Sequence, residues 1–131
     1  MTKALFRKVD CIRIPVSDLE LALVFYRDSL GHELLWRKEN SVGLRIPESE
    51  AELVIHTEPE LFEVDLKVES AERAAKCFKD AGGEILYGPF DIPIGKCVVV
   101  KDPWNNKLVL LDSSKGTYVT DSKGKVIGLK K

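Results

Sequence analysis

The chain contains 131 residues with a mass of 14.7 kDa, the size of one domain that buries its own core. Its 20 basic and 21 acidic residues leave a net charge of −1, so no broad positive field attracts nucleic acid. No stretch approaches the roughly 18 to 20 apolar residues of a membrane span, and residues 1–10 lack the apolar segment of a signal peptide. We therefore expect a cytoplasmic protein without a membrane partner.

The first half of the chain has the pattern of a strand, a helix and three further strands. Residues 9–16 alternate between apolar and other side chains, as on a strand that buries one face. Ser17 or Asp18 can cap a helix whose apolar residues recur at helical spacing until Gly31. The expected strands cover residues 9–16, 33–38, 41–47 and 51–57.

The second half repeats this order. A shift of 52 positions superposes residues of similar type: Val16 on Val68, Tyr26 on Phe78 and Gly31 on Gly83. The expected elements are a strand at 62–68, a helix at 70–83 and strands at 84–89, 96–102 and 107–113.

These repeats predict an α+β fold of paired β-α-β-β-β modules within a single domain, residues 1–131. Module one covers about 8–57 and module two about 61–113. Each module is too small to bury its sheet alone, so we expect the two to pair around a pseudo-two-fold axis and leave a cup-shaped concave surface.

Residues 114–131 lie outside the two modules. Short apolar stretches flank the segment from Asp121 to Gly124, which has the residue types of a type I turn followed by a bulge. The pattern predicts a C-terminal β-hairpin, which either closes the cup or docks on a second subunit. A frayed basic tail is the alternative.

Two motifs resemble those of the vicinal oxygen chelate superfamily, which contains glyoxalase I, bleomycin-resistance proteins and extradiol dioxygenases. The segments 16–20 and 25–31 are similar to the signature V-x-D-L-x…F-Y-x-x-x-L-G, and 102–106 resembles the turn D-P-x-G-N. The resemblance covers about residues 8–113 and implies an open, cup-shaped mixed sheet that holds a divalent metal and a substrate. It also implies a homodimer. It does not fix the reaction, which differs between members.

The resemblance further implies four metal-ligand positions, one on the first strand and one on the fourth strand of each module. Cys11 and Glu63 occupy the first pair, and Val54 and Val109 occupy the second. A divalent metal needs three or more donor atoms, and valine offers none. We therefore expect the usual metal site to be absent, and no cofactor.

Strand alternation places a polar set on the cup side of the two central strands, opposite the residues that face the helices: Cys11, Arg13, Glu63, Asp65 and Lys67. Ion pairs across the strands, between Arg13, Asp65 and Lys67, account for such a set structurally. The functional alternative is a site for an anionic or polar small molecule, with Arg13 as the clamp.

His56 shares a strand face with Val54, so Cys11, His56 and Glu63 make an alternative three-ligand set for nickel, zinc or manganese. A lone histidine near a strand end is more often a solvated or core residue. A role for Cys11 as a nucleophile is also disfavoured. A thiol between apolar neighbours usually behaves as a small buried side chain.

Aromatic residues near the cup offer a second mode of binding. The loop expected at 87–93, together with Trp36 and Trp104, resembles the surfaces with which drug-binding relatives sandwich a planar ligand. Core packing is the alternative for Trp36, whereas Trp104 lies in a polar turn and is harder to bury.

The sequence therefore supports two functions. The first is a bleomycin-resistance-like protein that binds a small polar or anionic molecule without metal, through residues of the cup and its rim: Arg13, His56, Glu63, Asp65, Lys67 and Trp104. The second is a metal-dependent lyase or isomerase of the glyoxalase (lactoylglutathione lyase) type, whose ligands are Cys11, His56 and Glu63. Valine at two ligand positions favours the first, and no catalytic residue is assigned.

Overall fold

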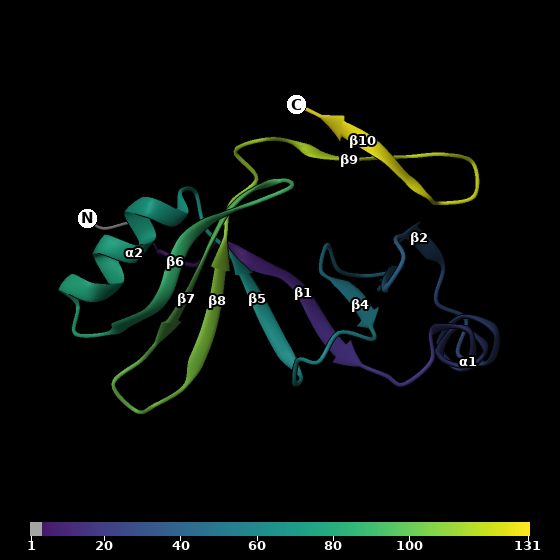
Figure 1. Cartoon of the computed structure of the whole chain (residues 1–131), viewed down its shortest axis with the longest axis horizontal. Helices are drawn as coiled ribbons and strands as arrows, with labels where there is room; N and C mark the ends of the chain where they lie inside the picture. The colour runs from purple at the N-terminus through teal and green to yellow at the C-terminus, as the bar shows by residue number, and fades with distance from the viewer. Residues whose placement is uncertain (1–3) are drawn as a thin grey trace. The chain divides into compact units, whose positions relative to one another are not determined.

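The computed structural model describes residues 4–131, which form two compact units (Figure 1). The module-one unit comprises Asp10–Glu63 and Tyr118–Gly128. The module-two unit comprises residues 4–9, Val64–Thr117 and Leu129–Lys131. Each unit contains strands and a helical segment in the order that the repeat predicts, which confirms the α+β fold.

The sheet of the module-one unit has the strand order β2-β3-β4-β1. Strand β4 runs parallel to β1 and antiparallel to β3, so the sheet is mixed. One face of this sheet packs against the first helical segment through a buried apolar cluster that includes Leu23, Leu44 and Ile55. The strands are β1 (Lys8–Pro15), β2 (Leu34–Arg37), β3 (Ser41–Arg45) and β4 (Glu52–His56).

The helix α1 (Leu19–Leu23) is shorter than predicted because the chain continues as a π-helix, η1 (Val24–Ser29). Asp18 starts α1, since its Oδ1 accepts a hydrogen bond of 3.0 Å from a backbone N–H in the first turn. At the end of η1 the N–H of Leu30 reaches back five residues to the carbonyl of Phe25, at 3.0 Å. The wider turn rotates side chains out of the α-helical register, and Leu30, the last apolar residue of the predicted helical pattern before Gly31, is 54% exposed.

The module-two unit repeats the arrangement, with the strand order β5-β8-β7-β6 and β5 parallel to β8. Its helix lies across one face of the sheet (Figure 1), where small residues of the helix, including Ala71 and Ala74, pack against Val98, Val100 and Leu110. No helix in residues 4–131 has the length and apolar character that crossing a membrane requires. The elements are β5 (Glu63–Lys67), α2 (Ala71–Asp80), β6 (Glu84–Ile92), β7 (Gly95–Lys101) and β8 (Lys107–Leu111).

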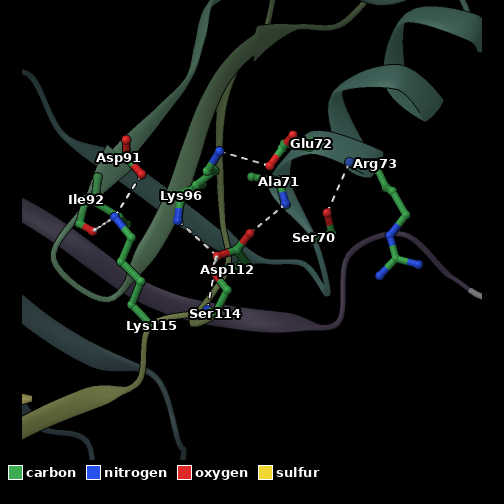
Figure 2. Close-up of polar contacts among 10 residues, drawn as sticks. All are labelled: Ser70, Ala71, Glu72, Arg73, Asp91, Ile92, Lys96, Asp112, Ser114 and Lys115. Carbon is green, nitrogen blue, oxygen red and sulfur yellow. Dashed lines mark hydrogen bonds and ion pairs between the residues drawn. The ribbon is translucent and has the colours of Figure 1, made fainter. Parts of the chain in front are cut away.

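Asp112 joins the start of α2 to the sheet (Figure 2). Its buried carboxylate accepts hydrogen bonds from the backbone N–H groups of Ala71 (2.8 Å), Lys96 (2.9 Å) and Ser114 (3.1 Å), and from the Ser114 hydroxyl (2.8 Å). Burial alone raises the pKa of Asp112, but these four donors outweigh it and hold the pKa below its usual value. One carboxylate therefore fixes a helix, a strand and the chain that follows β8.

Strand β6 extends to Ile92 and so includes most of the segment 87–93, which was predicted to be a loop; this prediction was wrong. The segment pairs with β7 through Tyr87, opposite Val99, and Phe90, opposite Cys97. Register shifts on both sides of Tyr87 accommodate the proline that follows, as bulges do at sheet edges. The two rings stack at 5.7 Å between centroids on an edge strand, where both are exposed.

The C-terminal extension is the predicted hairpin, formed by β9 (Thr117–Thr120) and β10 (Val126–Lys130). Asp121 shapes the turn, since its Oδ1 accepts from two backbone N–H groups and its carbonyl accepts from Gly124. The turn docks on the edge strand β2, where the N–H of Arg37 donates to the carbonyl of Gly124 at 2.6 Å. Residues Tyr118–Gly128 of the extension thus belong to the module-one unit.

Candidate functional site

The candidate site lies on the face of the module-one sheet that looks away from α1, which we call the site face. Residues of the opposite parity, Ile14 and Ile55, pack with the helical segment. Parallel pairing of β1 with β4 sets Cys11 beside Glu52 and Arg13 beside Val54. The site face therefore carries Cys11, Arg13, Glu52, Val54 and His56.

Arg13 is the centre of an acidic cluster. Its Nη2 lies 3.6 Å from Oε1 of Glu58, and its Nε lies 3.9 Å from Oε2 of Glu60 and 3.7 Å from Oε2 of Glu63. These separations exceed the roughly 2.7 to 3.2 Å of a direct N–H···O hydrogen bond. The guanidinium is thus attracted by three carboxylates without being locked to any of them, and its side chain is 18% exposed.

The cluster holds more negative than positive charge, because three carboxylates face one guanidinium. Burial raises the pKa of Glu60, Arg13 opposes the rise, and the neighbouring Glu63 and Glu58 add to it. A ligand that brings a hydrogen-bond donor or a positive charge reduces the repulsion between these carboxylates, whereas an added anion increases it.

His56 is linked to the same cluster through Glu58. The backbone N–H of Glu58 donates to Nδ1 of His56 at 3.2 Å, so Nδ1 is an acceptor and the neutral ring carries its proton on Nε2. The side chain is fully buried, and Nε2 has no hydrogen-bond partner among residues 4–131. The site face therefore contains a buried N–H donor next to the acidic cluster.

An aromatic group lies beside Glu52 on the site face. The indole Nε1 of Trp36 donates to Oε1 of Glu52 at 2.7 Å, and the ring lies directly over Gly43. Burial raises the pKa of Glu52, and the hydrogen bond from Trp36 opposes that rise. Trp36 is half-buried, in keeping with the packing role considered for it.

The C-terminal hairpin contributes to this aromatic group. The Tyr118 ring lies 5.9 Å from that of Trp36, and Lys38 Nζ sits 4.2 Å from the Tyr118 ring centroid while donating to its hydroxyl. A residue outside the family's two modules thus packs beside Trp36.

Three of the predicted binding residues come together in the module-one unit. Arg13 and Glu63 form an ion pair, and His56 joins them through Glu58. Sequence reasoning missed Glu58 and Glu60, because they follow the end of β4 in a turn, where strand alternation assigns no face. The available signal was the acidic run Glu58-Pro59-Glu60 directly after a strand that ends in His56.

The other three predicted residues belong to the module-two unit. Asp65 is buried in β5, in register with Val109 of β8. Lys67 lines a surface depression with Arg7 and Lys8. Trp104 is 78% exposed in the turn between β7 and β8. Within the module-one unit, the ion pairs of Arg13 go to Glu58, Glu60 and Glu63.

Residues 8–110 match the profile of the Glyoxalase/Bleomycin resistance protein/Dioxygenase superfamily. The chain belongs to this superfamily. Its D-P-x-G-N-like turn keeps a left-handed residue at the glycine position, where Asn105 has φ 71°. A comparison with the curated proteins found no match.

Solved structures share the fold of this superfamily member. Methylmalonyl-CoA epimerase from Mycobacterium tuberculosis is 16% identical with a TM-score of 0.72, covering 86% of this chain and 91% of that one. A hypothetical protein from Bacillus halodurans is 17% identical with a TM-score of 0.66, covering 80% and 93%. Homoprotocatechuate 2,3-dioxygenase from Brevibacterium fuscum is 23% identical with a TM-score of 0.60, covering 82% of this chain and 37% of that one.

The superfamily's usual metal does not fit the residues at its ligand positions. Val54 and Val109 have no lone pair to donate, and both are buried in their strands. Within residues 4–131, no three His, Cys, Asp or Glu side chains are arranged to hold a metal ion, and Cys11, His56 and Glu63 form no such group. The hydrogen bond from the Glu58 N–H to Nδ1 of His56 also favours the tautomer that carries its proton on Nε2, and that nitrogen then has no lone pair for a metal.

Proposed function

We propose that this superfamily member binds a small polar molecule on the site face, without the metal of its metal-dependent relatives. One observation carries the proposal: the partly exposed guanidinium of Arg13 lies 3.6 to 3.9 Å from three carboxylates and bonds directly to none of them. Its N–H donors are therefore within reach of a ligand's acceptor, and the carboxylates are within reach of a ligand's donor.

The charge of the cluster selects the ligand class. Because Glu58, Glu60 and Glu63 outnumber Arg13, a carboxylate or phosphate meets net repulsion there. Of the polar and anionic ligands expected from the sequence, we retain the polar ones: neutral amides, amino compounds and zwitterions that carry a donor beside an acceptor. The Trp36 and Tyr118 rings supply apolar contact for the rest of such a ligand.

A fragment screen on the metal-stripped protein tests this proposal. Neutral amides, primary amines, amino acids and simple carboxylates are compared by the NMR shift of the Arg13 Nε–H group, and hits are titrated. We expect amides or amines to bind the parent and to lose about tenfold in affinity in Arg13→Gln. Arg27→Gln is the matched control, because Arg27 pairs with Asp28 outside the cluster. Hits that bind Arg13→Gln as tightly as the parent contradict the proposal.

A further inference from the structure

A surface depression lies at the end of β5 in the module-two unit. Its volume is about 360 Å³. Small-molecule sites begin at about 300 Å³, so the depression has room for a small ligand. It is lined by Arg7, Lys8, Lys67, Val68, Glu69, Ser113 and Ser114.

Positive charge predominates in this depression, although the chain as a whole carries a net charge of −1. Three cationic side chains and one carboxylate line it, which leaves a formal net charge of +2. The backbone holds two of the cations together, because the N–H of Arg7 donates to the carbonyl of Lys67 at 2.8 Å. The guanidinium of Arg7 makes one long contact, from Nη1 to the carbonyl of Ala4 at 3.3 Å.

Two acidic side chains of this unit, Asp112 and Glu72, are already engaged with other groups (Figure 2). The Asp112 carboxylate accepts four hydrogen bonds, and Glu72 pairs with Lys96 at 3.0 Å. The first turn of α2 is engaged as well. The Asp112 carboxylate accepts a hydrogen bond from the N–H of Ala71, and Ser70 Oγ accepts one from the N–H of Arg73. Recognition in the depression therefore comes from its own side chains and not from the helix terminus.

We propose that this depression binds the phosphate groups of a small phosphorylated molecule. A phosphate carries close to two negative charges at neutral pH, which matches the lining, whereas a single carboxylate carries one. Its tetrahedral oxygens accept from a planar guanidinium and from point-charged ammonium groups at once, and a serine hydroxyl adds a neutral donor. We assign the contact with the phosphate oxygens to Arg7, Lys67 and Ser113.

Calorimetry with pyrophosphate, inorganic phosphate and succinate at low salt tests the proposal. We expect pyrophosphate to bind most tightly, and its dissociation constant to rise by about tenfold in both Arg7→Gln and Lys67→Gln. Lys107→Gln removes the same charge from an exposed position at the start of β8 and should change binding by less than about twofold. Circular dichroism confirms that each variant is folded.

Three results overturn the proposal. The first is succinate binding as tightly as pyrophosphate, and the second is equal losses of affinity in Lys107→Gln and Lys67→Gln, which indicate general charge attraction only. Absence of pyrophosphate binding to the folded parent at about 10 mM overturns it too. Arg13→Gln distinguishes this proposal from binding on the site face. Because Arg13 does not line the depression, the variant should leave pyrophosphate affinity unchanged.

Discussion

The backbone N–H of Glu58 donates a 3.2 Å hydrogen bond to Nδ1 of His56, which makes a turn residue the determinant of a buried imidazole's tautomer. We predict that the nitrogen-15 NMR spectrum of the folded protein shows an unprotonated Nδ1 and a protonated Nε2 for His56. A proton on Nδ1 would contradict the arrangement. His32, whose Nδ1 lies 2.9 Å from the carbonyl of Arg45, is an internal reference, since a carbonyl partner requires the proton on Nδ1.

Asp112→Ala should be among the most destabilising single changes in the module-two unit. It leaves the N–H groups of Ala71, Lys96 and Ser114 without their acceptor, which we expect to lower the free energy of unfolding by about 2 to 4 kcal/mol. Asp80→Ala on the same helix removes an exposed ion pair with Lys76 and should change the free energy of unfolding far less. Urea denaturation of both variants measures the difference, and equal costs would refute the role of Asp112.

The same carboxylate predicts a pH dependence. The pKa of Asp112 is lower in the folded chain than in the unfolded one, so its ionised form stabilises the fold above the ordinary aspartate pKa of about 3.9. That contribution is lost as pH falls from there through the folded pKa. The parent should therefore lose stability below about pH 4 more steeply than Asp112→Ala does. Parallel slopes of unfolding free energy against pH would exclude this effect.

Alternation and repetition in the sequence were sufficient to predict the two modules. Short-range hydrogen bonds explain where prediction failed: the π-turn that exposes Leu30 depends on a carbonyl five residues back, and β6 runs past a proline because bulges absorb it. For the site, strand alternation placed Arg13 and Glu63 correctly, but the other two glutamate partners, Glu58 and Glu60, lie in a turn without periodicity. Tyr118 was out of reach as well, since the contact between an added hairpin and Trp36 leaves no local pattern.

Gly43→Ala should disrupt the aromatic group of the site face. A Cβ at position 43 would lie 2.0 Å from the indole Nε1 of Trp36, so the ring must move and its hydrogen bond to Glu52 must break. We expect a loss of about 1 to 3 kcal/mol in unfolding free energy and a change in the tryptophan emission spectrum. Gly128→Ala is the matched control, because a Cβ there meets no atom within 4 Å. An unchanged spectrum in Gly43→Ala would show that Trp36 does not lie over the glycine.

A homodimer remains our proposal for the assembly. Several large apolar side chains are exposed, among them Leu61 at 87% and Phe62 at 62%, and a symmetric partner that covers them would remove that apolar surface from water. Sedimentation equilibrium at micromolar concentration should give roughly twice 14.7 kDa. Replacing both Leu61 and Phe62 with serine tests whether this surface is the interface, since the mass should then fall toward that of the monomer. A parent that sediments as a monomer would refute the proposal.

The most direct test of metal-independent binding on the site face is a titration of the best amide or amine fragment into untagged protein, in EDTA and again after dialysis against manganese, nickel or zinc. Because Val54 and Val109 cannot act as ligands, we predict the same dissociation constant in every condition and no stoichiometric metal by elemental analysis. About one metal ion per chain, together with a fragment affinity at least tenfold higher in its presence, would contradict the account.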